Sequence, residues 1–385
     1  MSLPPPSSGL RVALFTGNYN YIKDGVALTL NRLVAHLEKR GIPVLIFAPT
    51  GPMPAFQSVG ELIPVPSVPI PTRGEYRVAL GLPKQARQKL ADFKPSLFHI
   101  AVPDILGYQA LKLAEHWHVP VVSSYHTRYD TYLKFYGLSG FEKIGKNYLR
   151  KFYARCRMVY PPSQSMADIL RAEGLAQNVE VWTRGIDATL FSPVRRSLEW
   201  RRSFGIADDE PVISYVGRLV KEKNTGLLAD IYKELTRRGL RFRAMLVGNG
   251  PEEKSLRAAL PQAVFAGFLH GDDLARAYAS SDIFLFPSES ETFGNVTLEA
   301  MASGLPAVCA DASGSRSLVA EGETGYCVSA SLGAAAFADK IEGLLRDPAR
   351  RARFGEAARK RALTYDWETI MDGLIASYAR VLVAR

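Results

Sequence analysis

Residues 287–304 read PSESETFGNVTLEAMASG, and this stretch decides the fold that we expect. The apolar run just before it, residues 283–286, predicts a short buried strand, and residues 287–294 predict a loop. A helix is predicted to follow over residues 295–303 and to end at Gly304. A strand, a loop and a helix in this order are typical of one repeat of a parallel α/β sheet.

The predicted loop and helix carry groups that suit a phosphorylated sugar. In the first turn of the helix, the backbone N–H groups of residues 295–297 lack intrahelical acceptors, and with the helix dipole they would attract a phosphate. Glu291 stands just ahead of the helix and Glu299 about two turns further on. Each carboxylate could accept hydrogen bonds from sugar hydroxyls. The alternative is that both glutamates lie on the exposed surface of an ordinary amphipathic helix and its loop.

The residues around these two glutamates resemble the signature of the retaining glycosyltransferases of family 4. Pro287-Ser288 precedes them, Thr292-Phe293-Gly294 lies between them, and residues 298–306 surround and follow the second. The resemblance extends over nearly the whole chain. Its further segments are residues 184–193, 216–224, 246–251 and 267–270, then Tyr278 and Ser281-Asp282.

This resemblance implies the α/β fold called GT-B, in which two doubly wound Rossmann-like domains hold the nucleotide sugar in an interdomain cleft. It implies an acceptor-binding domain over residues 1–192 and a nucleotide-sugar-binding domain over residues 193–365. A C-terminal helix over residues 366–385 would then return to the first domain. Within the family, the chain is most similar to bacterial lipid mannosyl- and glucosyltransferases. The residues of this narrower similarity are Ser124-Tyr125-His126-Thr127-Arg128-Tyr129, Tyr132 and Tyr136-Gly137.

Apart from the resemblance, strand-like and helix-like segments alternate along the chain, and this alternation predicts βαβ units with parallel sheets. A ligand cleft is expected at the carboxyl ends of the strands. The strands expected in the first half are residues 12–16, 44–47, 97–100, 121–125, 158–160 and 179–182. Those expected in the second half are residues 212–216, 244–247, 264–266, 283–286, 307–310 and 326–328. The Pro-rich residues 49–71, with a strand or two at 62–65, are expected to form an irregular surface loop.

The chain has 385 residues and a net charge of +10, and all of the excess positive charge lies in residues 1–195. Residues 134–157 hold seven Lys or Arg and a single acid, Glu142, with aromatic and aliphatic residues between them. Such a basic aromatic segment can lie on an anionic membrane surface. The alternative is a helix whose apolar side enters the core while its lysines are solvated, and both can hold at once. No nucleic-acid module is recognised, so nucleic acid is not expected as a partner.

The chain does not open on a charged segment followed by an apolar run, and no run approaches about 18 apolar residues. We therefore expect a cytoplasmic protein, peripheral at the inner face of the cell membrane. Cys156, Cys309 and Cys327 lack Cys-x-x-Cys spacing, so buried free thiols are expected. No cofactor is expected, since the nucleotide sugar is a co-substrate.

Two cations follow the predicted strand at residues 212–216. Arg218 and Lys223 could neutralise a leaving nucleoside diphosphate without a metal ion, and the resemblance implies that no metal is required. Asp208-Asp209 and Asp272-Asp273 look like acids of a loop or a helix start, so no metal site is expected. Without their position after the strand, Arg218 and Lys223 would be ordinary solvated cations.

Gly25 and His126 are the main candidates in the first half. Gly25 precedes a predicted helix, where its lack of a side chain would let backbone approach a phosphate or sugar, although a simple turn glycine is equally compatible. The family usually has a glycine pair where this chain has Asp24-Gly25. His126 follows the strand at residues 121–125; a lone histidine is more often structural. The resemblance, however, implies that it lies beside the transferred sugar and stabilises charge without acting as a general base.

The catalytic candidates are therefore His126, Arg218, Lys223 and Glu291. The donor-binding candidates are Gly25, Gly217, Gly250, Phe268, Leu269, Phe293, Gly294, Asn295, Val296, Thr297 and Glu299. The acceptor-side candidates are Tyr125, Thr127, Arg128, Tyr129 and Tyr132.

The resemblance and these residues together predict a retaining, metal-independent hexosyltransferase that uses a UDP- or GDP-sugar and a membrane lipid or lipid-linked acceptor. It implies substitution on one face of the sugar, in which the leaving phosphate can take the acceptor proton. Two alternatives stay open. The first is the same chemistry on a soluble sugar or sugar-phosphate acceptor, and the second is a nucleotide-sugar-binding scaffold without catalysis. The sequence leaves the donor base, the sugar, the linkage position and the oligomeric state open.

Overall fold

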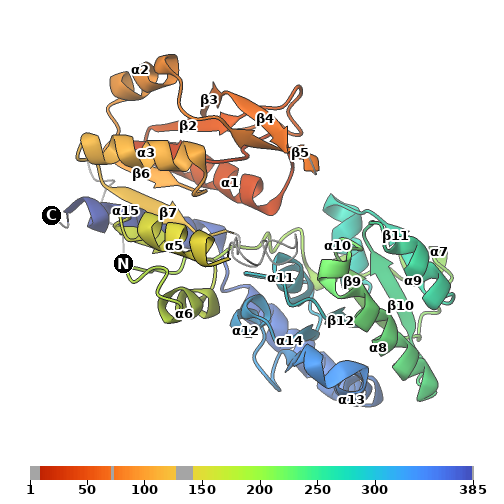
Figure 1. Ribbon diagram of the computed structural model, residues 1–385. Helices are drawn as coiled ribbons and strands as arrows, with labels where there is room; N and C mark the ends of the chain where they lie inside the picture. The colour runs from red at the N-terminus through yellow and green to blue at the C-terminus, as the bar shows by residue number, and fades with distance from the viewer. Residues whose placement is uncertain (1–8, 71–72, 127–141, 384–385) are drawn as a thin grey trace. The chain divides into compact units, whose positions relative to one another are not determined.

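The computed structural model describes residues 9–70, 73–126 and 142–383 of the chain (Figure 1). Packing divides the chain into two compact units. Unit 1 holds Met1–Thr183 and Glu368–Arg385, and unit 2 holds Arg184–Trp367. Within the described ranges, no helix is long and apolar enough to cross a membrane.

Unit 1 is built on a parallel sheet whose strands run in the order β3-β2-β1-β6-β7-β8. β1, β2, β6 and β7 are buried along their full length, as expected for parallel strands that helices cover on both faces. The strands are β1 (Val12–Phe15), β2 (Val44–Pro49), β3 (Glu61–Val65), β6 (Leu97–Ile100), β7 (Val121–Ser124) and β8 (Met158–Tyr160). The helices are α1 (Gly25–Lys39), α2 (Lys84–Phe93), α3 (Ile105–His116), α5 (Glu142–Tyr153), α6 (Gln164–Ala172) and α15 (Trp367–Val383).

Unit 2 repeats this arrangement with the strand order β11-β10-β9-β12-β13-β14. Its strands are β9 (Val212–Val216), β10 (Arg243–Val247), β11 (Val264–Gly267), β12 (Ile283–Phe286), β13 (Ala307–Ala310) and β14 (Gly325–Val328). Its α-helices are α7 (Leu198–Ser203), α8 (Thr225–Arg237), α9 (Glu253–Ala259), α10 (Gly271–Ala279), α11 (Asn295–Ala302), α12 (Ser313–Leu318), α13 (Gly333–Arg346) and α14 (Pro348–Ala362). The predicted doubly wound α/β class is therefore confirmed for each unit.

The boundary between the units lies at residues 183/184, whereas the sequence predicted residues 192/193. Residues 184–192 belong to unit 2 because their backbone is held there. Ile186 N donates to Tyr365 O over 2.9 Å, and Arg359 donates to the carbonyl of Ala188 over 2.9 Å. The predicted cleft between the two domains stays a prediction.

Two local expectations were only partly right. The strand expected at residues 62–65 is confirmed as β3, but the rest of the Pro-rich residues 49–71 was expected to be irregular, and β4 (Ser67–Ile70) pairs there antiparallel with β5 (Arg73–Ala79). A two-stranded ribbon tolerates proline because one edge of each strand makes no ladder hydrogen bonds. Residues 179–182 were expected to be a strand. They form the isolated bridge Val159–Val179 rather than a regular strand, although Glu180 N donates to Val159 O and Trp182 N to Pro161 O, so the segment lies along β8.

Helix α5 buries one side in unit 1 and exposes the other. Leu149 and Phe152 are at most 4% exposed, whereas Ile144 is 66% exposed. The predicted core-facing side of the basic segment is thus confirmed for the described residues 142–157, and residues 134–141 lie outside the described ranges. The three cysteines are free, as predicted; Cys156 and Cys309 are buried, and Cys327 is partly exposed.

The last helix, α15, packs against the other elements of unit 1 (Figure 1, blue). Asp372 accepts hydrogen bonds from His36 Nε2 over 2.6 Å and from Arg40 Nε over 2.9 Å. Both partners lie at or just past the end of α1, so α15 is tied to that helix. Residues 368–385 therefore complete a domain whose other residues end at Thr183.

Replacing Asp372 with Asn should lower the free energy of unfolding by about 1–3 kcal/mol at about pH 7, because the partly buried hydrogen bond from His36 and the exposed one from Arg40 lose their charged acceptor. Burial acts to raise the pKa of Asp372, but the hydrogen bonds from His36 and Arg40 outweigh it and hold the pKa below its usual range. Since folding lowers this pKa, the stabilisation is present above the unfolded value of about 3.9 and is lost as the pH falls further. Urea unfolding near pH 7 and near pH 3 measures the difference.

The matched control is Asp339→Asn, which removes the charge from a carboxylate that is 66% exposed. It should change the stability by no more than about 0.5 kcal/mol. Equal stability of the Asp372→Asn variant and the wild type near pH 7 would contradict the role given to this contact.

Candidate active site

The carboxyl ends of β9 and β12 lie side by side, because these strands are neighbours in the sheet of unit 2. The chain leaves β9 for β10 on one side and leaves β12 for β13 on the other. Doubly wound sheets bind ligands at such a reversal, outside the carboxyl ends of the strands. The segments that follow the two strands, residues 217–224 and 287–294, carry several of the predicted site residues.

Lys223 and Glu291 meet across these two segments. The Lys223 ammonium pairs with the Glu291 carboxylate and lies 3.0 Å from Ser290 Oγ. The two charged side chains are 15% and 22% exposed, so solvent screens their interaction only in part. Arg218 instead forms an exposed ion pair of 2.7 Å with Glu222. The structure therefore brings two predicted catalytic residues together and leaves Arg218 in a separate pair.

Close backbone packing explains the glycines of this region. A Cβ atom on Gly248 would lie 2.0 Å from Gly217 O, and one on Gly250 would lie 2.2 Å from Leu219 O. Gly217 N also donates to Val247 O over 3.0 Å. Gly217 and Gly250 were predicted as donor contacts, and packing alone already accounts for Gly250. Sequence reasoning missed Gly248, although it stands in the Gly-Asn-Gly turn after β10.

The start of α11 presents backbone rather than side chains. Gly294, just before the helix, has a φ of +96°, which favours glycine. Among the described residues, no side chain caps this helix. Asn295 is exposed and Val296 is partly exposed. The Thr297 hydroxyl is buried, so the N–H groups of the first turn are what this helix can offer an anion.

Phe293 was predicted to contact the donor, but its ring is 4% exposed and packs against Tyr365 at 6.0 Å. It therefore anchors the loop in the core of unit 2. At the end of β11, Phe268 is 69% exposed and stacks on His270 at 6.0 Å, while Leu269 packs against the core. Phe268, a predicted donor-binding residue, thus offers an exposed aromatic ring.

Glu299 lies on α11 beside Tyr278 of α10. The Tyr278 hydroxyl donates to Glu299 Oε2 over 3.0 Å. Burial raises the pKa of Glu299 to about 7, and the hydrogen bond from Tyr278 opposes the rise. Hydrogen bonds from ribose hydroxyls would favour the ionised form of this carboxyl. Sequence reasoning found Glu299 but not this contact between helices.

In unit 1, Gly25 is exposed at the first position of α1. Asp24 caps the helix by accepting from Ala27 N over 2.8 Å, and Asn18 Nδ2 donates to Asp24 Oδ2 over 2.9 Å. The aspartate that stands where the family usually has glycine therefore has a local structural role. It also places a carboxylate next to the backbone that was predicted to approach the donor.

Sequence reasoning missed Asp104, which follows β6 where the sheet order of unit 1 reverses. Its carboxylate caps α3 by accepting from Gly107 N over 2.8 Å. Burial raises the pKa of Asp104 to about 6, and backbone hydrogen bonds oppose the rise. A Cβ atom on Gly17, after β1, would lie 3.8 Å from Asp104 Oδ2. The available signal was a Pro-Asp pair just ahead of an apolar helix pattern.

His126 lies two residues after β7 and is 7% exposed. Its Nε2 is 2.7 Å from Ser124 Oγ, and its ring packs edge-on against Trp182 at 5.9 Å. Tyr125 is 1% exposed and packs against Tyr153, so its ring belongs to the core. The other acceptor-side candidates, Thr127, Arg128, Tyr129 and Tyr132, lie outside the described residues.

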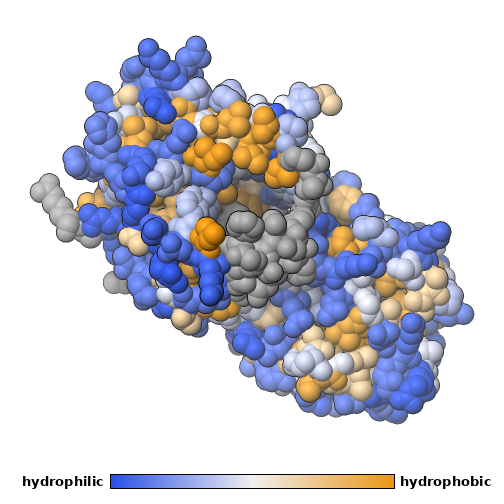
Figure 2. All heavy atoms as spheres, viewed as in Figure 1, coloured by the Kyte–Doolittle hydropathy of each residue, from blue (hydrophilic) through white to orange (hydrophobic). Residues whose placement is uncertain are grey.

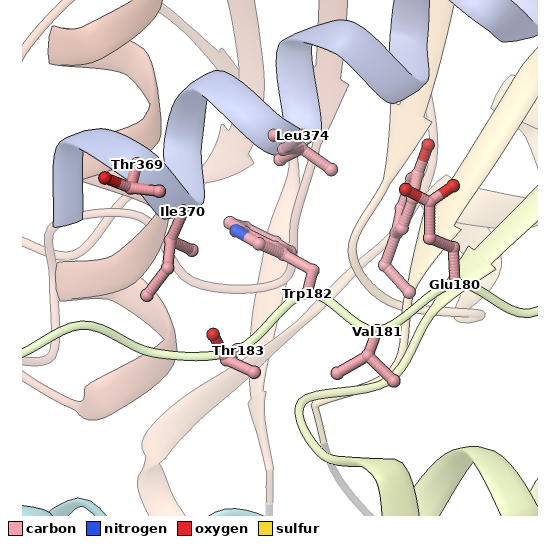
Figure 3. A pocket seen from close by; sticks show the side chains of 9 residues that line it. Glu180, Val181, Trp182, Thr183, Thr369, Ile370 and Leu374 are labelled. Carbon is pink, nitrogen blue, oxygen red and sulfur yellow. The ribbon is translucent and has the colours of Figure 1, made fainter. Parts of the chain in front are cut away.

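A pocket of about 270 Å³ opens in unit 1 between α15 and residues 180–183 (Figure 3). Figure 3 shows the Trp182 ring directed toward Ile370 and Leu374 of α15. None of the predicted site residues lines it.

The aspartate pairs that resemble metal motifs are engaged elsewhere. Asp208 pairs with Arg202 and Asp209 with Arg241, while Asp272 and Asp273 pair with Arg195 and Arg276. In the described part of the chain, no group of three or more His, Cys, Asp or Glu side chains is arranged to hold a metal ion. These acids serve surface ion pairs.

Comparison with known proteins identifies the family. The family model described as Glycosyltransferase Family 4 matches residues 23–190, and the one described as Glycosyl transferases group 1 matches residues 197–361. The chain is 34% identical over 380 residues to a GDP-mannose-dependent alpha-mannosyltransferase of Mycolicibacterium smegmatis, covering 98% of this chain and 99% of that protein. The chain belongs to the family 4 glycosyltransferases.

Two further likenesses, one in sequence and one in fold, are found for this family 4 glycosyltransferase. The chain is 26% identical to an alpha-monoglucosyldiacylglycerol synthase of Streptococcus pneumoniae over 78% of its own length and 70% of that protein. The fold matches sucrose-phosphate synthase from Thermosynechococcus elongatus with a TM-score of 0.79 at 20% identity, over 98% of this chain and all of that chain. The two Rossmann-like units of this glycosyltransferase are therefore those of a GT-B fold.

Replacing Glu299 with Gln should stabilise the ligand-free glycosyltransferase at alkaline pH. Folding raises this pKa from 4.5 to about 7, so the folded state binds the proton more tightly and stability falls as the pH rises between these values. Gln cannot ionise, so the variant does not lose stability in this way. The free energy of unfolding of the Glu299→Gln variant should exceed the wild-type value by up to about 3 kcal/mol near pH 8 and by almost nothing near pH 4. Urea titrations at both pH values measure the difference.

Glu289→Gln is the matched control, because Glu289 is an exposed glutamate of the same loop. It should follow the wild type at both pH values. A Glu299→Gln variant that is no more stable than the wild type near pH 8 would show that this carboxyl is solvated.

Proposed function

We propose that this glycosyltransferase moves a hexose from a UDP- or GDP-sugar to a membrane lipid or lipid-linked acceptor, with retention at the anomeric carbon and without a metal ion. The observation that carries the proposal is the Lys223–Glu291 pair, which lies at the reversal of the unit 2 sheet just ahead of α11. A cation, helix N–H groups and carboxylates are combined there, and a nucleotide sugar presents a diphosphate and hydroxyls that match them.

Donor binding would rearrange this pair. In the ligand-free protein, Glu291 compensates the charge of Lys223. A diphosphate at the start of α11 would attract the ammonium, which sits on a flexible four-carbon stem and can turn toward it. Glu291 would then accept hydrogen bonds from the hydroxyls of the sugar. Arg218 would supply a second cation, and Glu299 would accept from the ribose.

The reaction itself asks for charge stabilisation. As the bond between the anomeric carbon and the phosphate oxygen breaks, negative charge grows on the diphosphate, where Lys223 and the α11 N–H groups stabilise it. Positive charge grows on the sugar, where the Glu291 carboxylate would support it, and we propose that His126 lies beside the sugar. The acceptor hydroxyl attacks from the face that the phosphate leaves, and its proton passes to the phosphate. No protein base is needed for this step.

A lipid acceptor is supported by an apolar surface of unit 1. Figure 2 shows hydrophobic side chains gathered over the part of unit 1 that holds α3, β4 and β5. Tyr108 of α3 contacts Tyr148 of α5 at 6.4 Å, so the surface continues onto α5. We call the following residues, which are 37–66% exposed, the apolar strip: Val68, Leu80, Ile105, Tyr108, Ile144 and Tyr148.

Cations border the apolar strip. Lys112 and Arg155 lie 5.9 Å and 5.7 Å from the centre of the Tyr108 ring. Lys143 and Lys151 are exposed on α5. Apolar side chains beside cations suit a membrane interface with anionic headgroups. Ile105 is the first residue of α3, which follows β6. The apolar strip therefore reaches the carboxyl ends of the strands, where doubly wound sheets bind ligands.

Replacing Lys223 with Ala should lower kcat by about 10²–10³-fold, the cost of losing one preorganised electrostatic partner. Release of nucleoside diphosphate from the donor that supports the highest wild-type rate measures the change. Lys221→Ala is the matched control, because Lys221 lies on the same short helix but is exposed, and it should keep kcat within about twofold. An unchanged kcat in the Lys223→Ala variant would contradict the assignment of Lys223 to the donor site.

Replacing both Ile105 and Ile144 with Asp should weaken binding to vesicles of phosphatidylcholine and phosphatidylglycerol by at least about tenfold, since burial of either side chain would contribute more than 1 kcal/mol. Flotation of the full-length protein through a density gradient measures the bound fraction. The control is Val194→Asp, at a position of unit 2 that is 87% exposed, which should float like the wild type. A wild-type protein that stays with the soluble fraction would favour a soluble acceptor.

A further inference from the structure

A buried chain of hydrogen bonds runs from the last helix to His126. Tyr378 OH of α15 lies 2.6 Å from His99 Nδ1. His99 Nε2 lies 2.9 Å from Ser124 Oγ, and Ser124 Oγ lies 2.7 Å from His126 Nε2. These four residues are between 0% and 7% exposed, so water has little access to the chain. Tyr378 and His99 are 279 residues apart in the sequence.

The sheet of unit 1 places His99 in this chain. Successive residues of a strand face opposite sides of the sheet, and the neighbours of His99 on β6, Phe98 and Ile100, belong to the apolar core on one side. His99 therefore faces the other side, where it meets Tyr378. Trp182 packs edge-on against both His99 and His126 at 5.9 Å, which fixes the planes of the two imidazoles.

The direction of proton donation follows from the two buried end groups. Burial raises the pKa of Tyr378 well above its ordinary value, so this phenol keeps its proton. Among the described residues, His99 Nδ1 is the hydrogen-bond partner of that hydroxyl. Tyr378 must then donate to His99, because a buried O–H group without an acceptor is costly.

Each later bond is set by the one before it. Burial lowers the pKa of His99 to about 3, so this imidazole is neutral and has a single N–H group. Since Nδ1 accepts from Tyr378, the proton lies on Nε2 and is donated to Ser124 Oγ. The hydroxyl of Ser124 must in turn donate its own proton to His126 Nε2.

We propose that Tyr378, His99 and Ser124 are positioning residues that hold neutral His126 with its proton on Nδ1. Nε2 of His126 accepts from Ser124 within unit 1, so the proton on Nδ1 is the one that the imidazole can donate. The inference rests on the proposed function for the role of His126 beside the sugar. There His126 would donate a hydrogen bond to a sugar oxygen from Nδ1, and the last helix would set which nitrogen does so.

The tautomer of His126 can be observed directly. Long-range ¹H–¹⁵N correlation spectra of protein labelled with ¹⁵N-histidine distinguish a protonated from an unprotonated ring nitrogen. The His126 signals are assigned by their loss in a His126→Gln variant. We expect Nδ1 of His126 to be protonated and Nε2 to be unprotonated in the ligand-free wild type. A protonated Nε2 as the main species would overturn the proposal, and this reading needs no other variant to fold.

Tyr378→Phe tests whether Tyr378 sets the direction of proton donation, because it removes the hydroxyl at the start of the hydrogen-bond chain. The His126 signals should shift toward the other tautomer. The kcat should fall by about tenfold with KM for the donor unchanged, as is found when a group that hydrogen-bonds to a functional histidine and orients it is removed. Tyr160→Phe is the matched control. It removes a buried hydroxyl that hydrogen-bonds to Ser377 of α15 but takes no part in the hydrogen-bond chain to His126. It should leave the His126 signals and kcat unchanged.

Unaltered His126 signals in a folded Tyr378→Phe variant would also overturn the proposal. The spectrum tests the tautomer of His126, and the rate tests whether the protein transfers a sugar. An Nδ1–H tautomer in a protein that transfers no sugar would leave the positioning chain in place and remove the proposed function. A transferase with His126 in the other tautomer would do the reverse.

Discussion

The ion pair between Lys223 and Glu291 is the contact on which the candidate donor site depends. Three features of unit 2 produce it. Parallel neighbours β9 and β12 end at the same edge. The segment after β9 lies against that after β10 because Gly248 has no side chain. The segment after β12 is held from α12, where Gly314 N donates to Glu291 O over 3.1 Å. Two residues 68 positions apart can then form one ion pair at the start of α11.

Unit 1 uses its last helix in a comparable way. α15 is tied to α1 through Asp372 and to β6 through Tyr378. The second tie reaches His126 through buried side chains, so the residues that complete the domain also order a candidate catalytic group. Buried polar chains of this kind are costly when any member lacks its partner, and for that reason they fix a single arrangement.

The sequence predicted the strands of both sheets well because parallel strands covered on both faces are short apolar runs, such as residues 283–286. It missed β4 and β5 because prolines obscure a ribbon that tolerates them. Motif resemblance selected positions but not side-chain directions. Tyr125 and Phe293 stand in the predicted motifs, yet their rings are buried. The contact of Tyr278 with Glu299 depends on how two helices pack, which local sequence does not specify.

The central claim is that the chain transfers a hexose from a nucleotide sugar to a lipid without a metal ion. The most direct measurement is nucleoside diphosphate release from a panel of UDP-, GDP- and ADP-sugars, with EDTA throughout, in the presence and absence of a total bacterial lipid extract. The account predicts release from one UDP- or GDP-sugar that rises when lipid is added. A rate of release that does not change when lipid is added would contradict the lipid acceptor, and no release from any donor would contradict catalysis.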